Sequence, residues 1–247
     1  YLRKVGFNRV IVDQPELVGA LRGQIEGCEV EYKDLGTEIS RSKDARDLEH
    51  VREAARIADL GMTVAFAANR PGLSCLDVIA EGEYAMLKAG AEDATMAPAV
   101  GEGTFYLDSA ENPRRIIREG DMIFIDMAIH VRGYLGDMTR AGIVGEGTQE
   151  QRDMLETVQR AYRTGAGAMC PGADGADIYR QVVACFAERG WKEYYVHHLS
   201  HGLGLGGDLP RIGSAASDVL QVGDALSCEP GVYIPGLGGA RVENMIY

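Results

Sequence analysis

The chain contains one structural pattern twice, with corresponding landmarks about 100 residues apart. In each copy, two helix-like stretches precede two strand-like stretches joined by a turn. An acidic residue follows the glycine of a Gly-Asp pair by six positions in both copies: Asp126 after Gly120, and Glu229 after Gly223. The pattern predicts an α+β fold with a pseudo-twofold ααββ duplication, in which one curved antiparallel sheet carries its helices outside.

The helices of the two copies have recognisable ends. Ser74 and Thr148 are each followed three residues later by an acidic or amide side chain, which is the pattern of a capping box, and Asp174 is typical of an N-cap. Gly90 and Gly190 stand where C′ glycines are favoured. The predicted helices cover residues 43–68, 75–89, 149–169 and 175–189.

The first strand pair is expected over residues 121–130 and 134–144. A hairpin centred on Val131 and Arg132 would place Asp126 opposite Asp137. The alternation of a strand puts Asp126 on one face and a row of isoleucine and methionine side chains on the other. A carboxylate in so apolar a strand requires a partner.

The second strand pair is expected over residues 224–229 and 240–247, around the glycine-rich stretch 235–239. A turn centred near Gly236 sets Glu229 opposite Glu243. The acidic residues of both copies would then meet where the two halves join, and concave sites favour such seams.

Five residues in the second half of the chain form a candidate metal site: Asp126, Asp137, His201, Glu229 and Glu243. Their four carboxylates would repel one another prohibitively in a buried cluster without cations. Two divalent ions about 3.5–4 Å apart would balance that charge and can generate a nucleophile from water. The alternative is a set of solvated surface acids, which the apolar strands around them disfavour.

Several ordered motifs carry a resemblance over residues 40–247. They are Gly120-Asp-Met-Ile-Phe-Ile-Asp126, Gly133-Tyr-Leu-Gly-Asp-Met-Thr-Arg140, Ser200-His-Gly-Leu-Gly-Leu205, Glu229-Pro-Gly-Val-Tyr233 and Gly238-Gly-Ala-Arg-Val-Glu243. They resemble the signatures of the pita-bread metallopeptidases, which comprise the prolidases, Xaa-Pro aminopeptidases and methionine aminopeptidases, with creatinase as a metal-free relative. The Glu-Pro-Gly-Val-Tyr form is more similar to the prolidase and Xaa-Pro branch.

The resemblance implies a dinuclear, metal-dependent hydrolase of the Xaa-Pro peptidase type. Asp126 would chelate one ion, Asp137 and Glu243 would bridge both, and His201 and Glu229 would complete the second. A hydroxide bridging the ions would attack the amide carbonyl, and Glu229 would relay its proton. Mn²⁺ is the expected ion, with Mg²⁺, Co²⁺, Zn²⁺ or Fe²⁺ as alternatives.

The chain departs from the family where the family binds its substrate. Members of the family carry a histidine seventeen positions before the first aspartate and another seven positions after the metal histidine; Ser109 and Asp208 stand there instead. A third family histidine is retained as His197, which is a candidate catalytic residue together with Asp208. Its neighbour His198 should point the other way along a strand and pack. Thr139 is expected to support the ligands.

These departures keep two other functions open. One is a drifted non-peptidase, either a hydrolase or a lyase acting on a small zwitterion, as one relative in this fold does with a sulfonium compound. Asp208 would then face a cation or act as a base, and Arg211 or Arg241 would face a carboxylate; Arg241 could instead pair with the ligand carboxylates. The other is a catalytically silent binding module, which the complete ligand set disfavours.

Composition narrows the partners. The formal net charge of −12 disfavours nonspecific binding to nucleic acid or anionic membranes. Five cysteines without CxxC spacing predict reduced thiols and a cytoplasmic protein. The expected partner is a small peptide or small molecule, and a homodimer is expected from the family resemblance.

Two domains are predicted. Residues 1–40 read as strand, helix and strand, and they resemble the last βαβ unit of an N-terminal α/β domain such as prolidase-like proteins have. Residues 41–247 would form the pita-bread catalytic domain.

Overall fold

The computed structural model describes residues 5–25, 27–105, 114–206, 209–215 and 217–247. The α-helices are α2 (Pro15–Arg22), α3 (Leu35–Arg41), α4 (Ala45–Ala68), α5 (Cys75–Ala89), α6 (Gln149–Ala168) and α7 (Gly175–Ala187). The strands are β1 (Arg9–Val12), β2 (Glu29–Tyr32), β3 (Asp93–Val100), β4 (Met122–Val131), β5 (Tyr134–Ile143), β6 (Leu226–Cys228), β7 (Gly231–Ile234), β8 (Gly238–Arg241) and β9 (Asn244–Ile246). Two 3₁₀ helices, η1 (Gly101–Phe105) and η3 (Lys192–Tyr194), complete the described elements.

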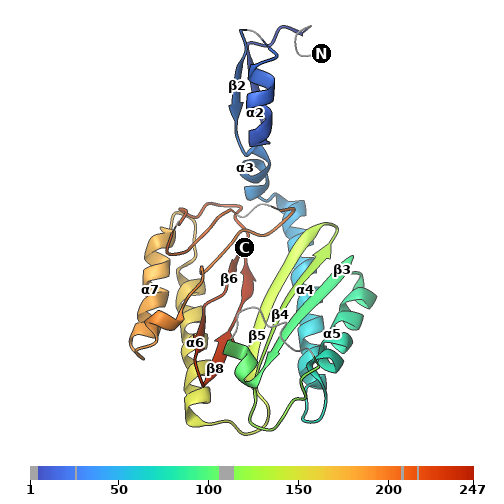
Figure 1. Ribbon diagram of the computed structural model, residues 1–247, viewed down its shortest axis with the longest axis vertical. Coiled ribbons are helices and arrows are strands. Elements are labelled where there is room, and N and C mark those ends of the chain that lie inside the picture. The colour runs from blue at the N-terminus through green and yellow to red at the C-terminus, as the bar shows by residue number, and fades with distance from the viewer. Residues whose placement is uncertain (1–4, 26, 106–113, 207–208, 216) are drawn as a thin grey trace.

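The first half packs α4 and α5 against the antiparallel sheet β3-β4-β5 (Figure 1). One face of β4 supplies the apolar side chains of this core, and they are almost fully buried: Ile123, Ile125, Met127 and Ile129. Asp126 lies on the opposite face of the same strand, as the alternation predicts. The apolar face therefore fixes the strand so that Asp126 points away from the helices.

The second half packs α6 and α7 against the short ladders β6-β9 and β7-β8, on the other side of the molecule (Figure 1). The predicted N-caps are confirmed: Thr148 forms a capping box and the Asp174 side chain accepts from the Ala176 amide. The helix α7 ends two residues earlier than predicted, and Gly190 has its positive φ in the turn that follows.

The predicted curved sheet consists of separate ladders that meet at one bridge. Among the described residues, Thr139 of β5 pairs with Glu243, which lies between β8 and β9. The ladders of β6-β9 and β7-β8 share one register, and this register sets Glu229 across from Glu243 as predicted. The two halves therefore join at the acidic residues.

One predicted pairing is wrong. Asp126 is opposite Thr139, and Asp137 is opposite Ala128. The turn of the hairpin is formed by Arg132 and Gly133, both with positive φ, which suits a two-residue turn of a twisted hairpin. The shift is two residues, so both aspartates keep the predicted face.

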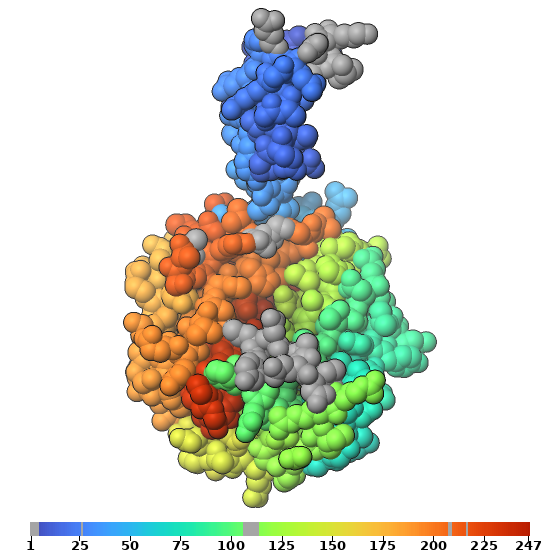
Figure 2. Space-filling model, in the orientation of Figure 1, coloured from blue at the N-terminus to red at the C-terminus, as the bar shows by residue number. Residues whose placement is uncertain are grey.

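The N-terminal segment of β1, α2, β2 and α3 projects from the rounded body (Figure 2). The strands β1 and β2 are parallel, and α2 packs on them. The segment is held to the body at Arg41, whose guanidinium forms two hydrogen bonds of 2.8 and 2.9 Å with the Asp224 carboxylate and a third of 2.8 Å with the Val219 carbonyl.

None of the helices in the described ranges is long and apolar enough to cross a membrane. All five cysteines lie within the described residues and carry free thiols.

The contact between α4 and α5 gives a test of the fold. A Cβ at Gly82 would lie 2.9 Å from the Gly61 carbonyl oxygen and 2.6 Å from the Met96 sulfur, whereas nothing lies within 4 Å of a Cβ at Gly167 on α6. We expect Gly82→Ala to lower the free energy of unfolding by about 1–3 kcal/mol because of overpacking. Gly167→Ala should raise it by up to about 1 kcal/mol. Urea denaturation measures both, and equal effects would contradict the packing.

Candidate metal centre

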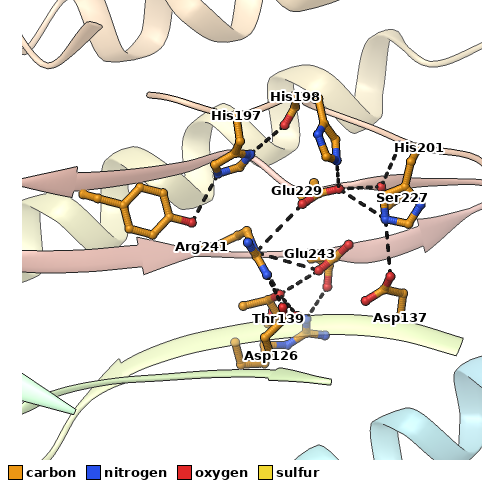
Figure 3. Close-up of polar contacts among 12 residues, drawn as sticks. Asp126, Asp137, Thr139, His197, His198, His201, Ser227, Glu229, Arg241 and Glu243 are labelled. Carbon is orange, nitrogen blue, oxygen red and sulfur yellow. Dashed lines mark hydrogen bonds and ion pairs between the residues drawn. The ribbon is translucent and has the colours of Figure 1, made fainter. Parts of the chain in front are cut away.

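The five predicted ligands come from both halves and point into one region (Figure 3). Asp126 lies on β4 and Asp137 on β5, and His201 follows η3. Glu229 and Glu243 occupy the short gaps between β6 and β7 and between β8 and β9. Burial deepens from Asp126, with 34% of its side chain exposed, to Glu243, with 1% exposed.

His201 is oriented to offer one nitrogen to the carboxylates. Its Nδ1 lies 3.0 Å from the Gly202 carbonyl oxygen, so Nδ1 carries the proton and donates it. Its Nε2 lies 3.3 Å from Asp137 Oδ2 and 3.4 Å from Glu229 Oε1. Burial lowers the pKa of His201, but the bond to Asp137 and the charge of Glu229 outweigh it and raise the pKa to about 9. His201 therefore balances part of the negative charge as a cation.

Glu243 is the most buried carboxylate of the cluster. Burial, with the charges of Asp137 and Glu229, raises its pKa well above the ordinary range. Its Oε2 lies 2.6 Å from Thr139 Oγ1, which also lies 2.7 Å from Asp126 Oδ1. Its Oε1 is buried without a hydrogen-bond partner among the described residues. Such an oxygen is costly to bury, so its position indicates a ligand.

Arg241 is the permanent cation of the cluster. Its guanidinium pairs with Asp126, and its Nε donates to Thr139 Oγ1 at 3.0 Å. Nε also lies 3.9 Å from Glu243 Oε2 and 4.0 Å from Glu229 Oε2. This geometry agrees with the alternative in which Arg241 pairs with the carboxylates of the predicted ligands. The role of Arg241 as a substrate contact stays a prediction.

The donor set fits divalent cations. Two groups of ligand atoms within 4.8 Å of one another occur among the described residues: Asp137, His201 and Glu243, and His198, His201 and Glu229. Asp126 belongs to neither group, because it is turned to Arg241 and Thr139. Carboxylate oxygens with imidazole nitrogen suit Mn²⁺, Zn²⁺, Co²⁺ or Fe²⁺.

His197, a catalytic candidate from the resemblance, makes its hydrogen bonds beside the carboxylates and not to them. Its Nδ1 donates to the His198 carbonyl oxygen at 2.7 Å, so its Nε2, 3.2 Å from the Tyr233 hydroxyl, accepts. Burial and the charge of Arg241 lower the pKa of His197 to about 4. His197 is therefore a neutral imidazole near neutral pH.

His198 was expected to pack away from the site, and this expectation is wrong. Its Nε2 lies 3.1 Å from Glu229 Oε1. The stretch that carries it is irregular between η3 and Ser200, so the alternation of a strand does not apply. The only sequence feature that could have indicated a role for His198 is its position directly after His197.

A cavity of about 590 Å³ opens beside the centre, and its lining includes His197, His198, His201 and Arg211. Arg211 belongs to the lining of this cavity, and its contact with a substrate carboxylate stays a prediction. Its backbone amide donates to Asp218 at 2.8 Å. The predicted roles of Asp208 and Ser109 concern positions outside the described residues.

Comparison with known proteins identifies the class. Residues 49–247 match the metallopeptidase family M24, and because this match covers most of the chain, the chain belongs to that family. The solved prolidase from Pyrococcus furiosus superposes with a TM-score of 0.87 at 27% identity, over 96% of this chain and 72% of that one. The family resemblance and the pita-bread fold predicted from the sequence are confirmed.

Particular relatives are prolidase-like. The chain is 31% identical over 216 residues to the Xaa-Pro dipeptidase of Pyrococcus furiosus. The aligned region covers 86% of this chain and 62% of that protein. The solved Xaa-Pro dipeptidase from Bacillus anthracis matches with a TM-score of 0.87 at 27% identity. The chain spans 57–62% of the length of the first curated relatives it matches.

The charge balance predicts how stability depends on pH without metal. The pKa of His201 is raised from 6.5 to about 9, so its stabilisation is complete below about pH 6.5 and is lost as the pH rises through 9. The raised pKa values of Glu243 and Asp137 act in the same direction. Protein treated with a chelator should therefore lose thermal stability as the pH rises between these values.

Mn²⁺ should flatten this dependence, because bound ions stabilise the deprotonated ligands. Glu243→Gln should flatten the chelated profile, since the amide carries no buried charge. Thermal denaturation at several pH values, with chelator and with Mn²⁺, measures both effects. Identical profiles with and without Mn²⁺ would contradict the charge balance described.

Proposed function

We propose that this chain carries the catalytic centre of a dinuclear metallopeptidase that cleaves small peptides of the Xaa-Pro type. The observation that carries the proposal is the cluster itself: four carboxylates and His201 converge, and Glu243 Oε1 is buried without a partner among the described residues. The relatives named Xaa-Pro dipeptidase or prolidase support the substrate class.

The ions would be held by Asp126, Asp137, His201, Glu229 and Glu243, with Mn²⁺ as the first candidate. When bound, such ions supply an activated water and polarise a carbonyl. Glu229 would accept the proton of that water, because its carboxylate contacts the cavity-lining His198 and its lowered pKa keeps it in the ionised form that can accept a proton. Burial raises that pKa, but the bond from His198 and the charge of Arg241 outweigh it.

Ser227 would orient Glu229 for this task. Its hydroxyl donates to Glu229 Oε1 at 3.0 Å and accepts from the His201 backbone amide at 3.1 Å. One side chain thus ties the proton acceptor to the imidazole ligand. His197 would contribute a neutral imidazole held by Tyr233, and Arg211 would bind a carboxylate in the cavity.

The non-peptidase alternative remains because Ser109 and Asp208 replace two family histidines. A site with an anion at position 208 favours a substrate that carries a cation, such as a small zwitterionic amide. Both functions need the same ions, so a substrate panel separates them. The catalytically silent alternative requires instead that no ion binds.

The division of the chain is also a proposal. Residues 1–40 would be the end of a preceding α/β domain, which the projection of β1, α2 and β2 supports. Residues 41–247 would be the catalytic domain. A homodimer, as expected from the family resemblance, would be detected by light scattering.

Hydrolysis of Xaa-Pro dipeptides and Xaa-Pro-Yaa peptides by the Mn²⁺-loaded protein tests the main proposal. Glu229→Gln should lower kcat by about 10²–10⁴, the usual contribution of a general base. Glu156→Gln, on the exposed face of α6, is the matched control and should leave kcat unchanged. Amino acids released over time are the measurement.

Peptide turnover that survives Glu229→Gln would reject the assigned role of Glu229. No peptide turnover by a protein with two ions bound would reject the peptidase, and turnover of betaine-like or zwitterionic amides would then support the alternative. Failure to bind Mn²⁺ or any other divalent ion would favour the binding module.

Arg211 gives a separate prediction about specificity. Arg211→Gln should lower kcat/KM for peptides with a free carboxylate by about 10- to 100-fold, as expected for a hydrogen bond to a charged group. Peptides with an amidated C-terminus should be cleaved equally by both proteins. Arg163→Gln on the exposed face of α6 is the control. An equal loss on both kinds of peptide would mean that Arg211 supports the loop and does not bind the substrate.

A further inference from the structure

His198 stands at the metal centre although none of the motifs of the site includes it. Its Nε2 lies 3.1 Å from Glu229 Oε1 (Figure 3). Its side chain is 52% exposed, and His198 belongs to the lining of the cavity. Its ring lies 5.7 Å from the ring of His201, with the two planes at 75°. Two imidazoles therefore face one carboxylate from different directions.

The distances among these three side chains are those of ligands around one ion. Metal bonds of about 2.1 Å place adjacent ligand atoms about 3.0 Å apart in an octahedron and about 3.4 Å apart in a tetrahedron. Glu229 Oε1 lies 3.1 Å from His198 Nε2 and 3.4 Å from His201 Nε2. All three ligand atoms lie within 4.8 Å of one another.

We propose that His198 is a further ligand of the ion held by His201 and Glu229, so that this half of the centre has two imidazoles. The inference rests on the metal centre of the proposed function and adds to its five ligands. It makes His198 a residue that sets which ion is bound.

The loop holds His198 in place without using its ring. The His198 carbonyl oxygen accepts from His197 Nδ1, and the other nitrogen of His197 is engaged by the Tyr233 hydroxyl. On the far side, Ser227 donates to the same Glu229 oxygen that His198 approaches. The exposed ring of His198 can thus turn onto an ion with no rearrangement of the backbone.

A second imidazole changes the ion preference. Oxygen-rich sites suit Mn²⁺ and Mg²⁺, whereas imidazole nitrogen suits Zn²⁺, Co²⁺ and Fe²⁺. His198 should therefore strengthen the binding of Zn²⁺ and Co²⁺ much more than that of Mn²⁺. Removing the ring should shift the relative affinities back toward Mn²⁺.

Two substitutions separate a ligand from a hydrogen-bond donor. His198→Gln keeps an N–H donor that can reach Glu229, but its amide is a poor ligand for Co²⁺. His198→Ala removes both functions. His130→Gln is the control, because His130 contacts Asp93 and lies outside the centre. The proteins are loaded with Co²⁺, and X-ray absorption counts the imidazoles per ion through the multiple scattering of the rings.

We expect the imidazole count of the full chain to fall about twofold in both His198 variants, from two rings per pair of ions to one, and to stay constant in His130→Gln. Calorimetric titration should show Co²⁺ and Zn²⁺ affinities lower by at least about tenfold in both variants, with a smaller change for Mn²⁺. Circular dichroism verifies that the variants are folded.

A His198→Gln protein with the wild-type imidazole count would overturn the inference and leave the proposed function intact, since His198 would then only donate to Glu229. A wild-type protein that binds no Co²⁺, Zn²⁺ or Mn²⁺ would overturn both. Equal losses of affinity for all three ions would reject the selective role.

Discussion

The mutual repulsion of buried carboxylates is the constraint on which the rest of the structure depends. Glu229 and Glu243 are nearly inaccessible to water, and a carboxylate oxygen of Asp137 lies within 4.8 Å of one of Glu243. Charges so placed need cations or protons. Arg241 supplies one permanent charge, His201 a second whose pKa is raised, and the raised pKa of Glu243 favours a proton there. These positive charges and the proton leave one group unsatisfied: Glu243 Oε1 has no hydrogen-bond partner among the described residues.

The duplication of the chain explains how the carboxylates reach one another. Each half packs its helices against its own strands, with Met122 of β4 reaching into the second core, so the strand pairs are held by apolar packing as well as by the site. The acidic residues lie on the strand faces that point away from these cores, or in the gaps between the strands. The Thr139–Glu243 bridge then joins the halves, and Thr139 contacts acidic side chains from both of them. The stability of the cores thus offsets the cost of assembling the charges.

Elements governed by periodicity and capping could be predicted from the sequence, and those governed by loop geometry could not. The strand that carries Asp126 was predicted from its alternating apolar residues. The capping boxes predicted at Ser74 and Thr148 are present at the starts of α5 and α6. The hairpin register was missed by two residues, because only the backbone shows that Arg132 and Gly133 form the turn. His198 was misplaced for the same reason: in an irregular loop, neighbouring residues do not alternate.

The residues proposed for catalysis and those proposed for substrate specificity also differ in whether they lie among the strands or on irregular segments. The carboxylates lie on strands or in the short gaps between them, where packing fixes their direction; in the proposed function they hold the ions that supply the chemistry. The residues that line the cavity, among them His197, His198 and Arg211, lie on irregular segments. A loop can exchange such residues without disturbing the cores, since its side chains carry little of the packing. Under the proposed function, a change of substrate would therefore be encoded in these segments, whereas the carboxylates that would hold the ions are fixed by the packing of the two halves.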